Sequence, residues 1–352
     1  MNGRERVRLA VQHKVTDRVP VDYAARADVT ENFRKYLGLP DQESLLQKLG
    51  VDIRRFPVIE IVPSFLERSG GESLIHHPDG TIENVWGVVQ KPSADGNYMQ
   101  MINGPFFETD DLDSFDWPSL DCIESVESVK KKVDVYNGEC SVFTYVNNPF
   151  KSCWQMRGLQ NYLCDTVADE DFAIALWERS AAYELQKGIN FIKAGGDVIQ
   201  VVGDIAMQDR MMVSPAAWRS IDKPRLAEML QTWKSYNPDI MLYFHSDGDM
   251  EEVLPDLIEI GFQIIDPIQP ECMDVNRIKK QYGKNFTIHG TISVQQTLPF
   301  GTVEDVRKET ESRIALAQED GGMIIAPANH VLDDTPLENF LEIYRTVGSF
   351  QK

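Results

Sequence analysis

Short apolar runs alternate with longer amphipathic segments along the whole chain. Runs such as Asp197–Val202 and Gly322–Ala326 are apolar at nearly every position, which is typical of parallel strands buried on both faces. In chain order, the pattern predicts strands over Val19–Tyr23, Arg54–Val58, Ser141–Val146, Asp197–Val202, Ile240–Phe244, Gln263–Asp266, Phe286–Gly290 and Gly322–Ala326.

The segments between these strands carry start and stop signals of helices. Ser214-Pro215 and Thr335-Pro336 each place a capping residue before proline, and Gly261 is a typical helix end. The predicted helices include Ser214–Lys234, Met250–Ile260, Thr302–Gln318 and Pro336–Val347. Regular alternation of strand and helix implies βαβ units with right-handed crossovers. Eight such units favour a (β/α)8 TIM barrel over an open doubly wound sheet.

Residues 68–118 interrupt this alternation. Thr81–Gln90 and Tyr98–Ile102 predict a β-hairpin around a turn at residues 95–97. We therefore predict one α/β barrel domain over residues 1–352, with a small β-hairpin insertion after the second strand. Loops over a barrel mouth often carry function, so the insertion is expected to form a partial lid.

Composition excludes several classes of function. The chain has 352 residues, of which 42% are hydrophobic and 26% charged, as in an ordinary globular protein. Its 35 Lys and Arg against 55 Asp and Glu give a net charge of −20. The acidic surplus is spread along the chain and argues against binding to nucleic acid or to an anionic membrane.

The cysteines and the N-terminus indicate the compartment. The 5 cysteines are odd in number and form no Cys-x-x-Cys pair, which is typical of a reducing environment. The charged N-terminus does not resemble a signal peptide, and no apolar run is long enough to span a membrane. We expect a cytoplasmic location.

Polar residues follow most of the predicted strands, where a TIM barrel carries its chemistry. Catalytic roles are predicted for Asp204 after the fourth strand, His245 after the fifth and His289 at the end of the seventh. Substrate contacts are predicted for Asn147, Asp266, Gln269, Asn329 and His330. For His289 and His330, structural hydrogen bonding is an equally simple interpretation.

The sharpest local signal is Phe244-His-Ser-Asp-Gly248, where an apolar strand ends in an imidazole and a carboxylate. These groups suit a metal site or proton transfer, although His245 would also bond loop backbone and Asp247 would also cap the next helix. Cys272 is the one cysteine near the predicted mouth, and its thiolate would join His245 on zinc. The predicted metal ligands are His245, Asp247 and Cys272, with Glu271 and His289 as further candidates. An unreactive thiol is the alternative for Cys272.

Several motifs in the same order resemble the uroporphyrinogen decarboxylase superfamily along nearly the whole chain. They are Arg18-Val-Pro-Val21, Asn84-Val-Trp-Gly-Val88, Gly203-Asp204, Ser214-Pro215, His245-Ser-Asp-Gly248, Leu254-Pro-Asp-Leu-Ile-Glu-Ile-Gly261, Pro299-Phe-Gly301 and Gly321-Gly-Met-Ile-Ile-Ala-Pro327. The resemblance implies a TIM barrel. It also implies one of two activities: decarboxylation of a porphyrinogen, or transfer of methyl groups to or from a corrinoid carried on a small partner protein.

The chain departs from the decarboxylase pattern where that enzyme binds its substrate. Two arginines that hold carboxylates of the porphyrinogen align with Ala25 and Val29, and Arg26 is adjacent but shifted. The aspartate that contacts the pyrrole nitrogens is absent from residues 57–60, unless Glu60 or Asp204 replaces it. A substrate with many carboxylates needs arginine clamps, so the sequence favours the methyltransferase branch.

That branch binds zinc through a His-x-Cys pair and a further cysteine. His245 matches the histidine, but Asp247 and Met323 stand at the cysteine positions. This difference favours an oxygen-richer site, made of His245, Asp247 and either the Glu271–Cys272 loop or His289, and a methoxylated donor. The resemblance thus implies zinc, a corrinoid-binding partner and a small methyl donor or acceptor, and a homodimer would fit the family. Porphyrinogen decarboxylation and a non-catalytic binding barrel are the alternatives.

Overall fold

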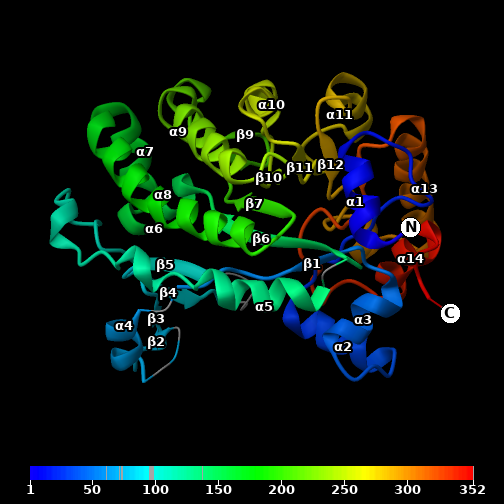
Figure 1. Cartoon of the computed structure of the whole chain (residues 1–352), viewed down its shortest axis with the longest axis horizontal. Coiled ribbons are helices and arrows are strands. Elements are labelled where there is room, and N and C mark those ends of the chain that lie inside the picture. Colours follow the sequence, from blue (N-terminus) through cyan, green and yellow to red (C-terminus); the bar gives the residue numbers. More distant parts are fainter. Residues whose placement is uncertain (61, 71, 73, 95–98, 137, 352) are drawn as a thin grey trace.

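The computed structural model describes the whole chain except residues 61, 71, 73, 95–98, 137 and 352. Its main feature is a curved sheet of parallel strands with helices on the outside (Figure 1). In sheet order the strands are β1 (Ile53–Arg55), β6 (Ser141–Asn147), β7 (Val198–Val202), β10 (Met241–His245), β11 (Ile264–Asp266), β12 (Thr287–His289) and β13 (Met323–Ile324). These are seven of the eight predicted barrel strands, in the predicted order.

The eighth predicted strand, Val19–Tyr23, closes the barrel without forming a regular strand. Val21 makes a parallel bridge to Ile325, next to β13. On the other side its carbonyl accepts a hydrogen bond of 3.0 Å from the amide of Asp52, next to β1. Pro20 has no N–H to donate, and the amide of Val21 donates to the Asp52 carboxylate at 2.8 Å instead of to a backbone carbonyl. The predicted barrel is confirmed, but this segment joins it largely through a side chain.

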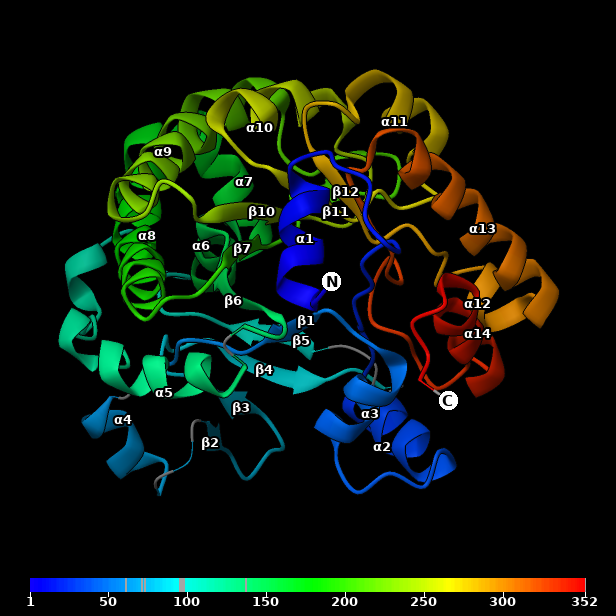
Figure 2. The same ribbon diagram turned by 45° about the vertical axis from the view of Figure 1, so that its right-hand side comes forward.

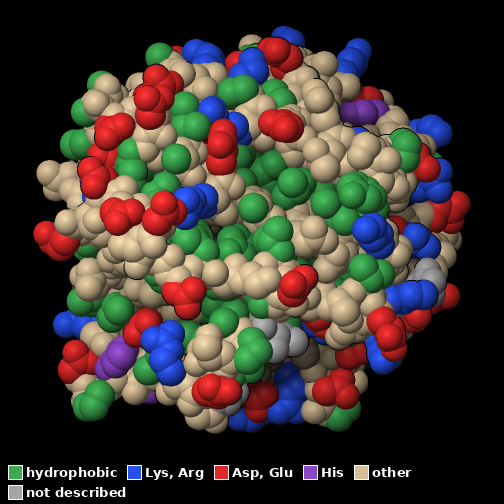
Figure 3. Space-filling model, turned by 60° about the vertical axis from the view of Figure 1, so that its left-hand side comes forward, with side chains coloured by type: hydrophobic (Ala, Val, Ile, Leu, Met, Phe, Trp, Pro, Cys, Tyr) green, Lys and Arg blue, Asp and Glu red, His purple; other side chains and the backbone are tan. Residues whose placement is uncertain are grey.

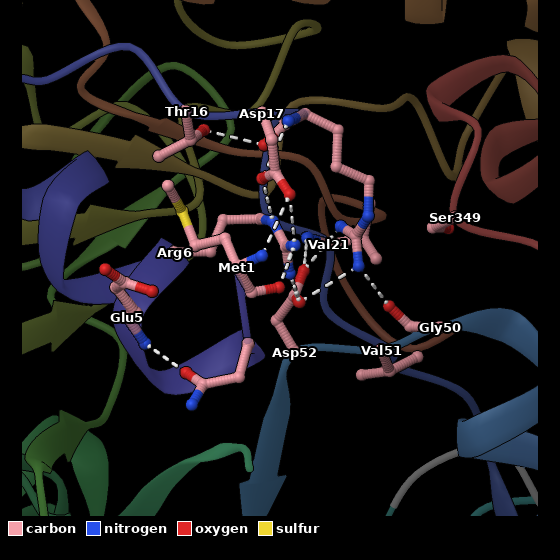
Figure 4. A network of polar contacts seen from close by, with 12 residues as sticks. Met1, Glu5, Arg6, Thr16, Asp17, Val21, Gly50, Val51, Asp52 and Ser349 are labelled. Carbon is pink, nitrogen blue, oxygen red and sulfur yellow. Dashed lines mark hydrogen bonds and ion pairs between the residues drawn. The ribbon is translucent and has the colours of Figure 1, made fainter. Parts of the chain in front are cut away.

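Asp52 is the centre of a buried network that ties the N-terminus to the barrel (Figure 4). Its carboxylate accepts hydrogen bonds from Arg6 at 2.6 Å and from Arg18 at 2.7 Å. Arg6 also donates to Asp17 at 2.8 Å. Arg6 belongs to helix α1 (Gly3–Val11), so the network fixes this helix against the barrel.

Helix α1 lies over the N-terminal end of the barrel (Figure 2). Its Val7 and Val11 are buried in one apolar cluster with inward-facing side chains of the strands, among them Ile53, Phe143 and Val198. Because side chains alternate along a strand, the next inward positions lie two residues further on. They include Arg55 on β1 and Gln200 on β7. The barrel interior is therefore apolar beneath α1 and polar towards the other end.

The helices follow the predicted alternation. Those present are α2 (Ala27–Tyr36), α3 (Gln42–Leu49), α4 (Pro63–Arg68), α5 (Val126–Tyr136), α6 (Pro149–Arg157), α7 (Leu159–Ala168), α8 (Glu170–Lys193), α9 (Pro215–Tyr236), α10 (Leu254–Ile260), α11 (Val275–Tyr282), α12 (Thr297–Phe300), α13 (Val303–Asp320) and α14 (Leu337–Val347). The helices predicted after Ser214, Thr302 and Thr335 are confirmed. The one predicted from Met250 begins as a 3-10 turn over Glu251–Val253 and becomes α-helical at Leu254.

The insertion is a four-stranded antiparallel sheet of β2 (Ile75–His76), β3 (Ile82–Glu83), β4 (Val89–Pro92) and β5 (Met99–Asn103). Strands β4 and β5 pair as the predicted hairpin, and its predicted turn at residues 95–97 lies outside the described residues. The prediction of one strand over Thr81–Gln90 is wrong. The Asn84 side chain accepts hydrogen bonds from the amides of Trp86 and Val88, which turns the chain between β3 and β4.

The surface carries both charge types. On the face shown in Figure 3, acidic side chains are spread among basic ones, and hydrophobic side chains gather around a central hollow. Among the described residues, no helix combines the length and the apolar character needed to cross a lipid bilayer.

Candidate functional site

A cavity of about 410 Å³ lies at the C-terminal end of the barrel strands. Its polar wall residues are Asp22, Gln42, Arg55, Gln200, His245, Asp266, His289, Asn329 and His330. Aromatic and small side chains, including Tyr23, Ala25, Tyr145 and Tyr243, complete the wall. The volume suits a small molecule. A wider hollow of about 720 Å³ beside α1 lies at the opposite end, where TIM barrels do not carry their chemistry.

A chain of buried charged groups runs along the wall of this cavity. Nδ1 of His245 lies 2.5 Å from one oxygen of Asp266, and Nδ1 of His289 lies 2.5 Å from the other. Nε2 of His289 lies 3.1 Å from Asp22 Oδ2, which also accepts a hydrogen bond of 2.6 Å from Arg55. Each group is therefore oriented by its neighbours from Arg55 to His245.

The protonation of this chain follows from its contacts. Burial by itself raises the pKa of Asp266 and of Asp22, but their cationic neighbours outweigh it and lower both. Burial likewise lowers the pKa of His289, but Asp266 and Asp22 outweigh it and raise that pKa to about 9. Since ionised carboxylates only accept hydrogen bonds, both nitrogens of His289 carry protons and Nδ1 of His245 donates to Asp266.

Two half-buried carboxylates, those of Asp204 and Asp247, meet beside the half-buried His245. Ligand atoms of Asp204, His245 and Asp247 all lie within 4.8 Å of one another. Nε2 of His245 is 3.9 Å from Asp247 Oδ1, a buried oxygen that has no hydrogen-bond partner among the described residues. Burial, with the charges of Asp204 and Asp266, raises the pKa of Asp247 to about 6 although His245 opposes the shift. One imidazole nitrogen and two carboxylates are a donor set that zinc accepts.

The structure brings most of the predicted site residues together. Asp266, His289, Asn329 and His330 line the cavity with His245. Asn329 also donates a hydrogen bond to Asp247. Gln269 is buried behind the site, where its side chain accepts a hydrogen bond of 3.2 Å from the amide of Gly248.

Two predicted residues lie apart from this group. Asn147 lines a separate pocket of about 50 Å³ under Trp86 of the insertion. The described part of the insertion contributes no wall residue to the main cavity, so the expected lid position over it is not observed.

Cys272 is outside the Asp204, His245 and Asp247 group, and its thiol lies 3.4 Å from Gln208. Burial, reinforced by the charge of Glu271, raises the pKa of this thiol to about 11, which disfavours the thiolate that zinc binds.

Sequence reasoning missed Asp22, Arg55 and Gln200. Only residues at or after the ends of the predicted strands were considered, whereas Arg55 lies near the start of the predicted strand Arg54–Val58 and Gln200 in the middle of β7. Both line the cavity. Counting back in steps of two from the strand ends would have found Gln200, because inward positions alternate. A charged residue inside an apolar strand was the available signal for Arg55.

A family model and a similar solved structure agree with this architecture. The chain matches the uroporphyrinogen decarboxylase (URO-D) family over residues 99–350. Among solved structures it is similar to a methyltransferase from Methanosarcina mazei, at 18% identity, with 99% of each chain covered and a TM-score of 0.71. It also aligns with an endo-1,4-beta-mannanase from Rhizomucor miehei, at 9% identity, with 95% of this chain and 94% of that chain covered and a TM-score of 0.46. No curated protein matches by sequence.

The family match covers well over half of the chain and includes β6, β10 and the site residues from Asn147 to His330. The similarity to the Methanosarcina protein, at that identity, supports the fold alone. Together with the closed parallel barrel, these findings confirm the resemblance indicated by the motifs: the chain belongs to the uroporphyrinogen decarboxylase family.

Proposed function

We propose that this chain is a methyltransferase that moves a methyl group between a small methoxylated compound and a corrinoid carried on a partner protein. The observation that carries the proposal is the group of Asp204, His245 and Asp247 beside a cavity of small-molecule size. The same group favours a metal-assisted reaction. An open position beside three protein ligands is typical of catalytic zinc sites.

The residues present fit a divalent metal ion. Asp266 holds a proton of His245 on Nδ1, so Nε2 is the nitrogen that would bind the ion. Burial lowers the pKa of His245, but Asp266 outweighs it and raises that pKa, so the ion would displace a proton from Nε2. The buried Oδ1 of Asp247, which has no hydrogen-bond partner among the described residues, would become a ligand of the ion. When bound, such an ion supplies Lewis acidity that polarises the ether oxygen of the methyl donor. Asn329, through its hydrogen bond to Asp247, orients the carboxylate.

The position of the cavity indicates where the corrinoid-carrying partner protein would dock. A corrinoid supplies the cobalt that accepts or donates the methyl group. We propose that the protein that carries it docks over the C-terminal face, where the cavity lies. His289 and His330 line the same cavity and would contact the bound donor.

The cavity argues against a porphyrinogen as substrate. Its described wall holds one arginine, Arg55, whereas a ligand with many carboxylates needs several arginine clamps. Ala25 lines the cavity at one arginine position of the decarboxylase, and Val29 is buried at the other. Glu60 forms an ion pair with Lys187 and does not line the cavity, so it does not replace the missing aspartate.

The test combines metal analysis with methyl transfer. Purified protein should contain about one metal ion per chain and should convert cob(I)alamin to methylcobalamin with a methoxylated aromatic donor, detected by absorbance. His245→Ala should lose both properties, whereas the control His76→Ala, at an exposed position in the insertion, should keep them. Turnover of uroporphyrinogen without methyl transfer would show that the proposal is wrong. Absence of both reactions and of metal would support the non-catalytic barrel.

A further inference from the structure

Arg55 is the one Lys or Arg side chain in the described wall of the cavity. It faces inward from β1, and its side chain is 24% exposed. Its guanidinium carbon also lies 5.4 Å from the ring centre of Phe143, a cation–π contact that stabilises the position of the side chain. The side chain is thus fixed and still reaches the cavity.

The guanidinium has more donors than its protein partner uses. Its one hydrogen bond among the described residues is from NH2 to Asp22, and its buried Nε has no acceptor. Asp22 Oδ2 is shared with Nε2 of His289. A guanidinium has five N–H donors arranged as a planar fork that matches a carboxylate. An anionic group in the cavity would satisfy donors that the protein leaves without acceptors.

Gln200 is a second, independent indication of a ligand. Its side chain lines the same cavity and is 7% exposed, yet its Oε1 has no hydrogen-bond partner among the described residues. A buried acceptor without a donor costs free energy. A hydroxyl group on a bound molecule would provide the missing donor.

The position of Arg55 separates it from the proposed metal ligands. Asp22, Tyr23, Gln42 and Arg55 also border a second cavity of about 260 Å³ beside α3. His245 borders the main cavity and is not part of the wall of the second one. Asp22, His289 and Asp266 lie between Arg55 and His245 in the chain of contacts. A molecule held at Arg55 therefore extends along this wall towards His245.

We propose that the cavity binds a small methoxylated carboxylic acid, with its carboxylate on Arg55 and its methoxy group directed towards His245. A hydroxyl of the same molecule donates to Oε1 of Gln200. The aromatic side chains of Tyr23, Tyr145 and Tyr243 in the wall suit a single aromatic ring. This inference rests on the proposed function for the methoxy end, and on Arg55 and Gln200 for the rest.

The test measures binding by titration calorimetry on the purified protein, without a corrinoid. 4-Methoxybenzoate and 4-methoxybenzamide differ in charge but hardly in shape. The wild type should bind the benzoate at least about 10-fold more tightly. Arg55→Gln should weaken binding of the benzoate by about 10–100-fold and leave the amide unchanged, and Arg55→Lys should have an intermediate effect because it keeps the charge but loses the fork.

Controls separate this effect from misfolding. Arg54→Lys changes the preceding arginine of β1, which donates hydrogen bonds to Glu43 outside the main cavity. This variant should leave the affinities for the benzoate and for the amide unchanged. Binding of the amide reports that a variant is folded, and Arg55→Lys decides the question if Arg55→Gln does not fold. Equal affinity of the wild type for both probes, an unchanged benzoate affinity in the Arg55 variants, or parallel loss of both probes would overturn the inference.

The hydroxyl contact at Gln200 and the methyl-transfer reaction are each tested by a separate measurement. The wild type should bind 3-hydroxy-4-methoxybenzoate more tightly than 4-methoxybenzoate, and Gln200→Leu should abolish that difference; persistence of the difference would remove Gln200 from the site. Methyl transfer to cob(I)alamin is scored independently. Carboxylate-selective binding without methyl transfer from any methoxylated donor would contradict the proposed function while leaving the carboxylate site at Arg55 supported.

Discussion

Nδ1 of His245 lies 2.5 Å from Oδ2 of Asp266, and this contact determines which nitrogen of the imidazole is available to a ligand. The carboxylate is ionised, so Nδ1 must donate, and in the neutral ring Nε2 is the nitrogen that carries the lone pair. Nε2 is the atom that approaches Asp247. The metal-binding ability proposed for His245 therefore depends on Asp266, which is itself outside the group of three ligands.

Asp266→Asn should weaken the affinity for zinc by about 10–100-fold. An amide has one oxygen and one NH2 group, so it accepts from one histidine but presents a donor to the other. One of His245 and His289 must then change its protonation. Zinc titration with a competing chelator measures the effect. Asp209→Asn, an exposed residue after β7, is the control and should be neutral. An unchanged affinity in Asp266→Asn would contradict the proposed role.

Gly290→Ala should disturb the same carboxylate from the opposite side. Gly290 has φ +63, and a Cβ there would lie 2.3 Å from Oδ1 of Asp266. We expect a loss of about 1–3 kcal/mol in the free energy of unfolding from backbone strain, together with weaker zinc binding. Gly261→Ala, at φ +107 but with open space around it, isolates the backbone effect. Urea unfolding should show a lower free energy of unfolding in both variants. Zinc titration should show a lower affinity in Gly290→Ala alone. Normal zinc binding in Gly290→Ala would exclude the predicted displacement of Asp266.

Asp222 should make the stability depend on pH. It is fully buried on α9, where one oxygen accepts a hydrogen bond of 3.0 Å from Trp177 and the other has no partner among the described residues. Burial raises the pKa of this carboxyl to about 7. Because the pKa is higher in the folded state, the protonated form favours folding, and stability falls as the pH rises from about 4 through about 7.

The loss attributable to Asp222 amounts to roughly 4 kcal/mol, at about 1.4 kcal/mol per pKa unit. Asp222→Asn cannot ionise, so the difference in unfolding free energy between this variant and the wild type should grow over that pH range and then level off. Urea denaturation at a series of pH values measures it. Parallel curves for the two proteins would show that Asp222 does not titrate in this range.

Asp52→Asn should destabilise the barrel by about 3–5 kcal/mol, because the buried Arg6 and the half-buried Arg18 lose the carboxylate that they share. It also weakens the contact that joins Val21 to β1. Asp17→Asn is the matched control: Asp17 bonds the same Arg6, but its side chain is 46% exposed. Its effect on the urea midpoint should be clearly smaller. An equal effect of the two variants would show that closure of the barrel does not depend on Asp52.

Much of the fold was predictable because its signals are local. The apolar runs at β7 and β10 and the caps before α9 and α13 depend on neighbouring residues alone. Asp204 follows β7, and His245 and Asp247 lie at the end of the adjacent β10, so the barrel prediction placed all three at the same edge. It did not predict that Asp204, and not Cys272, joins His245 and Asp247. The predicted catalytic and binding roles of the individual residues stay predictions until the variants are measured.

Other features were not accessible from local pattern. Thr81–Gln90 has the composition of a strand, but the Asn84 side chain bonds backbone amides and turns it. Val19–Tyr23 has the composition of a regular strand, but its pairing depends on the carboxylate of Asp52, far away in the sequence. The position of Cys272 apart from His245 depends on the path of the loop after β11.

The sequence by itself determined the barrel, its outer helices and the edge at which the chemistry should lie, because hydrophobic period, capping and strand order are properties of short segments. Only the tertiary structure decided which groups meet inside the barrel. Asp22, Arg55 and His289 come from segments remote from one another, and their pairing, protonation and remaining donors follow from burial in a shared cavity. Burial makes each unmet hydrogen bond costly, and this is why Arg55 and Gln200 indicate a ligand only once their surroundings are known.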